Sequence, residues 1–351
     1  MMLSPTEGAL VILSLVIVVL LVITLVFSVY ALLLRVRNGR RARLWETLKS
    51  RWEGPVLSAI VDPTRIDEVH QSVPEKYRLH FVNFILEYTR RVKGEERQTL
   101  RMLASPYLDL IVERMKHRDA GRRARAVQTL GTLGLPAYSS EVLVGLGDES
   151  PLVSMTAARY LARREFPEFA PTVLKHIDRF DAWNRRFLAS MLAEMGSEVS
   201  NTLRDGLIDD MRPDWLRAVF AEALRIQRDP LAGDPAAAAL GQDPDRELAA
   251  SLLRLIAEVG RAQHLPVVRL FASSEDGMLR SQAMHALGLL TDGSDLSALM
   301  EGLDDSSPWT AIHAARGVKE AGGRTLLEGM VADKHERNEL AGQVLFEEGE
   351  P

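Results

Sequence analysis

Residues 119–134 read Asp119-Ala-Gly-Arg-Arg-Ala-Arg-Ala-Val-Gln-Thr-Leu-Gly-Thr-Leu-Gly134, and the same arrangement returns farther along the chain. It consists of an aspartate, an arginine four residues later, and a run of small and apolar residues. Residues 276–288 repeat it as Asp276-Gly-Met-Leu-Arg-Ser-Gln-Ala-Met-His-Ala-Leu-Gly288. A match that returns at a fixed period is typical of a repeat architecture.

The period is 31 or 32 residues from about residue 105 onward. One register is a pair of small or apolar residues four positions apart, and a second register is one apolar residue earlier in each unit. The pairs are Ala126 and Leu130, Ala157 and Leu161, Leu188 and Leu192, Phe220 and Leu224, Ser251 and Leu255, Ala283 and Leu287, and Ala314 and Val318. The single residues are Met115, Leu146, Ile177, Ile208, Leu240, Phe271 and Leu303. The two registers predict two helices per unit, each with one apolar stripe.

Short polar segments separate the two stripes, for example Gly147-Asp-Glu-Ser-Pro151 and Asp304-Asp-Ser-Ser-Pro308. Such segments end one helix and cap the next. Because one hairpin cannot bury its stripes alone, neighbouring hairpins have to stack into a continuous core. The sequence therefore predicts an all-α protein with an α-solenoid over residues 105–351, whose charged last unit, Asp333 to Gly349, forms a polar cap.

The repeats resemble HEAT repeats, in the short bacterial form described as HEAT-like repeats of the phycobilisome-lyase type. The resemblance extends over residues 105–349 and rests on Asp119 with Arg123, Asp181 with Arg185, and Asp276 with Arg280. It implies the solenoid fold, but a shared fold does not carry function with it. Bilin lyases share the repeat, so the alternative function is a bilin-lyase-like accessory enzyme that holds a tetrapyrrole and a client protein.

Residues 8–34 contain no charged side chain and are followed by Arg35, Arg37, Arg40, Arg41 and Arg43. A bilayer core of about 30 Å needs roughly 20 apolar helical residues. A cleaved signal peptide would carry positive charge before a shorter apolar core, whereas Glu7 is the charged residue here. We therefore predict residues 1–7 outside the cell, a single membrane-spanning helix over residues 8–34 of the plasma (inner) membrane, a collar at residues 35–43 whose arginines contact lipid head groups, and a cytoplasmic repeat domain.

Residues 44–104 do not follow the repeat, and we expect them to form a helical N-terminal cap. Residues 44–52 have the pattern of an amphipathic helix, and Pro55, Pro63 and Pro74 are expected to interrupt the chain beyond it. Tyr77, Phe81, Phe84, Ile85 and Tyr88 mark one helix face. Trp45 and Trp52 fit either packing in this cap or a place at the membrane surface.

Composition narrows the function. The chain has no cysteine and a formal net charge of -5, and leaving out the five collar arginines and Glu7 makes the remainder -9. An acidic body argues against nucleic-acid binding, which depends on surplus Lys and Arg. We find no nucleophile elbow, no phosphate-binding loop and no metal-ligand spacing among the eight histidines. We therefore expect a binding protein and not an enzyme, with no cofactor, metal or small-molecule substrate.

Solenoids hold extended partners on the concave face made by their second helices. Two residues after each second-helix apolar residue stand Gln128, Arg159, Ser190, Glu222, Leu253, His285 and Arg316. From this row and the basic patch of Arg122, Arg125, Arg163 and Arg164 we predict partner contacts at Arg125, Gln128, Arg159, Glu222, His285 and Arg316. The alternatives are an ordinary solvated face, and a binding edge of Trp183, Trp215 and Trp309.

The recurring Asp and Arg are interpreted as a ladder of hydrogen bonds between neighbouring turns, in preference to a phosphate or carboxylate site.

Overall fold

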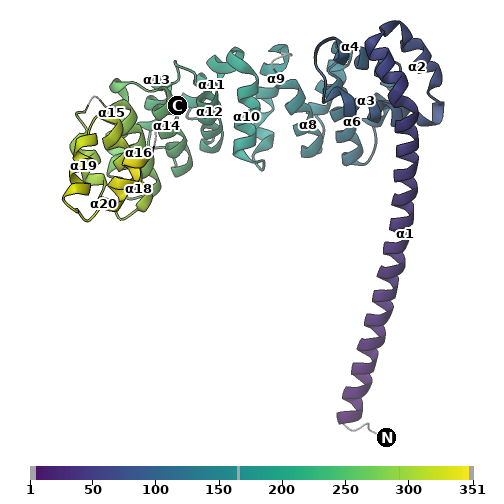
Figure 1. The fold of residues 1–351 in the computed structure, drawn as a ribbon, viewed down its shortest axis with the longest axis horizontal. Coiled ribbons are helices and arrows are strands. Elements are labelled where there is room, and N and C mark those ends of the chain that lie inside the picture. Colours follow the sequence, from purple (N-terminus) through teal and green to yellow (C-terminus); the bar gives the residue numbers. More distant parts are fainter. Residues whose placement is uncertain (1–4, 164–166, 292, 348–351) are drawn as a thin grey trace. The chain divides into compact units, whose positions relative to one another are not determined.

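The computed structural model describes residues 5–163, 167–291 and 293–347, which form helices joined by short turns, with no strand in these ranges (Figure 1). This confirms the all-α prediction. The chain divides into two compact units, one of residues 1–118 with 132–136 and the other of residues 119–131 with 137–351.

The first unit is built around aromatic side chains. Its helices are α1 (Pro5–Val61), α2 (Ile66–Ser72), α3 (Arg78–Thr89), α4 (Gly94–Ala104) and α5 (Asp109–Arg114). Trp52 of α1 is fully buried, with its ring centroid 5.2 Å from that of Phe81 and 5.8 Å from that of Phe84, both on α3. Of the two places considered for Trp52, the structure shows the core and not a membrane surface, while Trp45 is half-buried.

Helix α1 continues through Pro55, and the expected interruption there was wrong. A proline removes one hydrogen bond from a helix interior. Pro55 lies on the exposed side, whereas Val56 and Ala59 are fully buried. Tertiary packing thus holds the helix together beyond the proline. The other two prolines do stand at boundaries, because Pro63 begins a 3-10 helix and Pro74 precedes another.

Residues 18–34 of α1 are apolar and exposed. Within the described chain, one helix, Val18–Val61, is long and apolar enough to cross a membrane, with a mean hydropathy of 2.5 in its most apolar window. None of that window is buried. This distinguishes it from the core helix of a soluble domain, which buries its apolar side chains. An N-terminal signal sequence can also contain an apolar segment of this kind.

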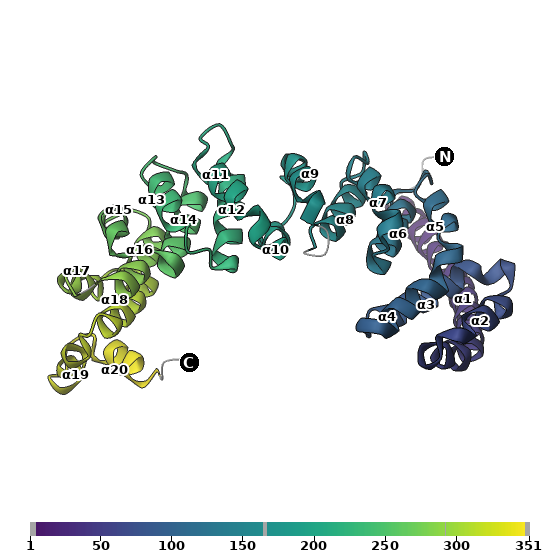
Figure 2. The same ribbon diagram turned by 90° about the horizontal axis from the view of Figure 1, so that it is seen from above.

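The second unit is a stack of helical hairpins (Figures 1 and 2). Its helices are α6 (Ala120–Leu133, of which the last two residues belong to the first unit), α7 (Ser139–Leu146), α8 (Pro151–Leu161), α9 (Ala170–Lys175), α10 (Arg185–Glu194), α11 (Ser200–Ile208), α12 (Asp214–Gln227), α13 (Gly233–Leu240), α14 (Arg246–Val259), α15 (Leu265–Ala272), α16 (Gly277–Leu290), α17 (Leu296–Gly302), α18 (Pro308–Glu320), α19 (Arg324–Ala332) and α20 (Asn338–Phe346). The second helices α10, α12, α14, α16 and α18 pack on one another in order, and α11, α13 and α15 form a layer beside them. We call the solvent side of α6, α8 and the other second helices the second-helix face.

The apolar registers form the core of this stack. All residues of the seven predicted pairs are buried, including Ser251. In the earlier register Leu146, Ile177, Leu240 and Leu303 are buried and Met115 and Phe271 are half-buried, whereas Ile208 is 44% exposed beside the fully buried Leu207. Ile208 is the last residue of α11, and Asp209 after it has an extended backbone. The side chain of Ile208 therefore lies at the open end of its hairpin.

The aspartates and arginines form the predicted ladder. Arg123 makes two bonds to Asp148 of the next turn, from Nε and from a terminal nitrogen, each of 2.8 Å. Arg280 binds Asp305 in the same way, at 2.7 and 2.8 Å. In the middle of the unit Arg217 donates to Gln242 Oε1 at 2.7 Å. Two of these contacts are ion pairs and the third is made to a neutral amide, and all three join successive hairpins, which confirms a structural role for Arg123, Arg217 and Arg280. Arg185 departs from the ladder, since it donates to the carbonyl of Asp181 in its own turn.

Replacing Arg123 with Ala should lower the melting temperature of the full chain by a few degrees, because Asp148 loses both bonds. The hydrogen bonds from Arg123 hold the pKa of Asp148 below its usual value. A lowered carboxyl pKa adds stability above about pH 4, and that stability is lost as the pH falls through the folded-state pKa. The difference in melting temperature between Arg123→Ala and wild type should therefore be smaller below pH 4 than at neutral pH, which thermal melts at the two pH values can measure. Arg125→Ala, at an exposed position two residues away, is the control and should leave the melting temperature nearly unchanged.

Candidate functional site

Three of the predicted contact residues lie open on the second-helix face. Arg125 and Gln128 on α6 and Arg159 on α8 all have exposed side chains. The guanidinium of Arg159 reaches toward the next hairpin, where it lies 5.7 Å from the ring centroid of Phe187 on α10. These residues carry charge and hydrogen-bonding groups that a partner can reach.

Glu222 lies deeper in the same face and is half-buried. It accepts two hydrogen bonds from Arg225, at 2.9 and 2.8 Å. Nε of Arg254 lies 3.9 Å from Glu222 Oε2. Burial acts to raise the pKa of Glu222, but the bonds from Arg225 and the charges of Arg225, Arg254 and Arg186 outweigh it, and the pKa is lowered. Glu222 is therefore an ionised carboxylate surrounded by guanidinium groups.

The predicted row is displaced by one residue on α14. Leu253, which the row placed on the binding face, is fully buried, and Arg254 beside it stands next to Glu222. The step from Glu222 to Arg254 is 32 residues, whereas the row assumed 31 at this point. In the apolar registers the step between repeats alternates between 31 and 32 residues. This alternation was the signal that the α14 member of the row could be Arg254 in place of Leu253.

A cavity of about 320 Å³ opens on the second-helix face between α10, α12 and α14. We call it the arginine cavity. It is lined by Arg185, Arg186, Ala218, Val219, Glu222, Arg225, Glu247, Ser251 and Arg254. Sequence reasoning selected Glu222 from this set and assigned Arg185 to the repeat motif. It missed Arg186, Arg225 and Arg254, because none of these three stands in the predicted row.

The C-terminal end of the row is occupied by the chain itself. Arg316 of α18 makes two bonds of 2.8 Å to the carboxylate of Glu347, which follows α20. His285 of α16 packs its ring 5.1 Å from that of His313. Lys319 also donates to the carbonyl of Val344 at 2.8 Å. His285 and Arg316 are thus engaged within the solenoid, so Arg125, Gln128 and Arg159 are the better positions for probing the face.

His313 makes stability depend on pH. Burial, followed by the charges of His285 and Arg316, lowers its pKa to about 4, and Glu347 opposes this shift. Between about pH 6.5 and pH 4, His313 is therefore protonated in the unfolded chain and neutral in the folded chain. We expect the melting temperature of the full chain to fall across this interval and His313→Gln to reduce the fall. His335→Gln, at an exposed position, is the control, and equal pH profiles for both variants would contradict the prediction.

The tryptophan edge is only partly open. Trp309 is 71% exposed, whereas Trp183 and Trp215 are half-buried. The guanidinium of Arg185 lies 4.2 Å from the ring centroid of Trp215, and the ring of Trp183 lies 6.3 Å from that of Phe187. Two of the three tryptophans therefore pack within the repeats.

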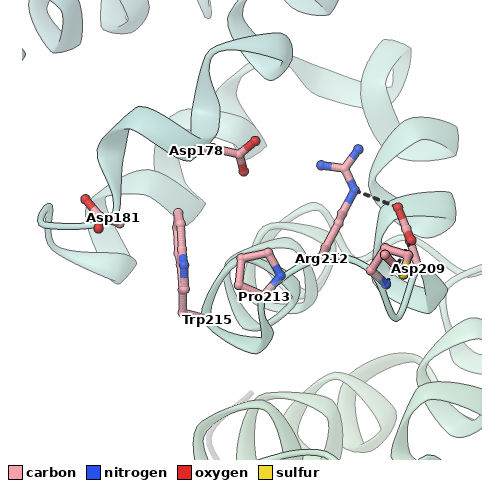
Figure 3. A pocket seen from close by; sticks show the side chains of 7 residues that line it. Asp178, Asp181, Asp209, Arg212, Pro213 and Trp215 are labelled. Carbon is pink, nitrogen blue, oxygen red and sulfur yellow. Dashed lines mark hydrogen bonds and ion pairs between the residues drawn. The ribbon is translucent and has the colours of Figure 1, made fainter.

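A second cavity, of about 410 Å³, lies at this edge beside Trp215 (Figure 3). It is lined by Asp178, Asp181, Asp209, Met211, Arg212, Pro213 and Trp215. Arg212 donates to Asp209 at 3.2 Å, the contact dashed in Figure 3. The lining has three carboxylates and one guanidinium, so it differs in charge from the arginine cavity.

The collar arginines Arg35, Arg37, Arg40, Arg41 and Arg43 are all exposed on α1. In the basic patch, Arg163 lies over the ring of Tyr160 and donates to the carbonyl of Gly131 at 3.3 Å, while Arg164 lies outside the described residues. Across the described ranges no three His, Cys, Asp or Glu side chains are grouped as metal ligands.

Comparison with known proteins identifies the type of helical repeat. A family model of HEAT repeats matches residues 233–319, from the start of α13 into α18. Among solved structures, Kap121p is 13% identical, over 78% of this chain and 36% of that chain, with a TM-score of 0.43. The complex of CpcE and CpcF of phycocyanin lyase from Nostoc sp. PCC7120 is 15% identical, over 64% of this chain and 80% of that chain, with a TM-score of 0.32. The chain therefore spans about a third of the length of Kap121p. A search of curated protein sequences gives no significant match.

Proposed function

We propose that this chain, which belongs to the HEAT-repeat proteins, is a membrane-tethered scaffold that binds a partner protein on its second-helix face. The observation that carries the proposal is the continuity of α1. Its residues 18–34 are apolar and exposed, and its C-terminal half buries Leu48, Trp52 and Val56 in the core of the first unit. One helix would thus be both the anchor and a structural element of the folded domain.

The continuity of α1 also bears on the signal-peptide alternative. Cleavage after the apolar stretch would cut within a helix that runs without a break from Pro5 to Val61. The five exposed arginines of the collar follow the apolar stretch, and positive charge is retained on the cytoplasmic side of membranes. We infer a single-pass protein of the plasma membrane, with its repeats in the cytoplasm and the collar arginines at the lipid head groups.

The repeats would supply binding and not catalysis. A stack of hairpins presents one long face with similar side chains at regular intervals, which suits an extended partner. Arg125, Gln128 and Arg159 are the exposed polar side chains on this face that the sequence row selected. They lie on two successive second helices, so one partner segment could contact all three.

Topology can be tested with single cysteines, because the chain has none of its own. In intact cells, a membrane-impermeant maleimide should label Thr6→Cys. Asn38→Cys, at an exposed collar position, should react only after the cells are broken. Labelling of the two positions in the opposite order would reverse the orientation, and release of the wild-type chain by alkaline carbonate would exclude the anchor.

Partner binding can be tested by crosslinking and affinity capture of the full chain from native membranes. The variant Arg125→Ala/Gln128→Ala/Arg159→Ala should lose the partner. It should keep its melting temperature, because exposed substitutions usually cost within about 0.5 kcal/mol each. Arg324→Ala, at an exposed position on α19, is the control. A partner that the triple variant retains as well as wild type does would remove this part of the face from the proposal.

A further inference from the structure

The arginine cavity carries more positive than negative charge. Arg185 and Arg186 come from α10, Glu222 and Arg225 from α12, and Glu247 and Arg254 from α14. Four guanidinium groups therefore share the cavity with two carboxylates. This is unlike the body as a whole, which is acidic once the collar is left out.

We propose that the arginine cavity is an anion site that receives a carboxylate or phosphate group presented by a segment of the partner protein. This inference rests on the proposed function and adds the chemistry of the partner. The choice of anion follows from general rules of recognition, because guanidinium groups match the planar, two-oxygen face of both anions.

Two of the four arginines are already occupied. Arg225 uses two nitrogens to bind Glu222. Arg185 donates to the carbonyl of Asp181 at 2.5 Å, and its guanidinium covers the ring of Trp215. Neither can turn to a ligand without giving up these contacts.

The other two arginines lack a carboxylate at bonding distance. A terminal nitrogen of Arg254 donates to the hydroxyl of Ser251 at 3.0 Å, but its nearest described carboxylate oxygen, on Glu222, is 3.9 Å away from Nε. Arg186 is exposed and makes no hydrogen bond or salt bridge to any residue that the structure describes. An anion between them would give both a partner.

Partial burial acts against the charge of Arg254. Desolvation is the largest effect on this residue and lowers its pKa, the charge of Arg225 lowers it further, and Glu222 and Glu247 act in the opposite direction. The side chain of Arg254 is still 38% exposed, so a ligand can reach its guanidinium from solvent. An anion bound there would add the counter-charge that offsets the desolvation.

The size and position of the cavity favour a side chain of a peptide. Its 320 Å³ holds an anionic head group together with the carbons that carry it. Ala218 and Val219 supply an apolar part of the lining beside the charges. The cavity also lies on the same face as Arg125, Gln128 and Arg159, which is the face proposed for an extended partner.

The test measures peptide binding to the full chain in detergent micelles by fluorescence anisotropy at low salt. The probes are a labelled decaglutamate, a labelled phosphoserine peptide and a labelled decaglutamine. Decaglutamate or the phosphoserine peptide should bind and decaglutamine should not, and the tighter of the two anionic probes identifies the source of the charge. Equal displacement of both by the same concentration of inorganic phosphate would overturn the peptide assignment in favour of a free anion.

Variants assign the binding to the cavity. The double variant Arg186→Gln/Arg254→Gln should weaken the binding of the anionic probe at least tenfold. The matched variant Arg324→Gln/Arg337→Gln removes the same charge from two arginines of the last repeat, which pair with Glu328 and Asp304, and should change binding less than twofold. Equal weakening by both variants would mean unspecific attraction and would overturn the site.

A third variant keeps the test valid if the double variant folds poorly. Glu222→Gln removes the carboxylate that competes with the ligand and frees Arg225, so it should bind the anionic probe more tightly than wild type. Weaker binding by Glu222→Gln at an unchanged melting temperature would contradict the proposal. Failure here is separable from failure of the proposed function: a partner captured from membranes by a chain that binds neither anionic probe would overturn the anion site alone.

Discussion

Leu287→Asp should unfold the hairpins around α16 and cost the full chain about 3 to 5 kcal/mol, because it leaves a carboxylate without a partner in the core. Leu287 is fully buried on a helix that packs against α14, α15 and α18. In a solenoid each repeat is stabilised mainly by its neighbours. We therefore expect loss of helical circular-dichroism signal at a lower urea concentration than in wild type, with the helices next to α16 the first to lose protection from hydrogen exchange.

Leu289→Asp is the matched control, because Leu289 lies on the same helix and is 48% exposed. It should change stability by about 0.5 kcal/mol or less. Acid should partly rescue Leu287→Asp and not the control, since protonation neutralises a buried carboxyl whose pKa is raised. Similar urea midpoints for the two variants would contradict the assignment of this helix face to the core.

Gly288→Ala should destabilise the protein by about 1 to 3 kcal/mol, because it forces two helices apart. A Cβ on Gly288 of α16 would lie 2.3 Å from the Cα of Gly317 on α18. Backbone atoms cannot turn aside as a flexible side chain can. The helices α16 and α18 therefore depend on glycine at their closest approach, and urea unfolding should show a lowered midpoint.

Gly329→Ala is the control, because it lies in helix α19 and a Cβ there would meet nothing within 4 Å. Alanine favours a helix interior over glycine by up to about 1 kcal/mol, so this variant should be neutral or more stable than wild type. The two glycine variants should thus shift the urea midpoint in opposite directions. If the urea midpoint fell by the same amount in both variants, the close approach of α16 and α18 would not be the reason that Gly288 is needed.

The repeat could be predicted from sequence because its signals are local. Apolar pairs one helical turn apart, returning every 31 or 32 residues with polar breakers between them, specify helices, turns and the inward face together. The role of Arg123 followed from the same regularity, since an arginine that returns at this position in several repeats is expected to serve the stack. The uncharged stretch before the collar likewise predicted the long exposed helix.

The candidate site could be predicted only in part, because contacts between hairpins depend on small displacements. A step of 32 in place of 31 buries Leu253 and brings Arg254 to Glu222. Glu347 closes over Arg316 although the two residues are 31 positions apart. The alternation of the repeat step left the first event open without deciding it, and no local pattern marks the second. Each depends on how neighbouring helices pack.

The sequence by itself therefore determined the all-α class, the repeat period, the register of buried pairs and the apolar stretch of α1, since each follows from spacing and composition. Tertiary structure decided that Trp52 lies in a core and that α1 continues through Pro55. It also decided which arginines are paired and which face an open cavity. The physical reason is range: helix periodicity acts over a few residues, whereas burial and ion pairing depend on groups that only folding brings together.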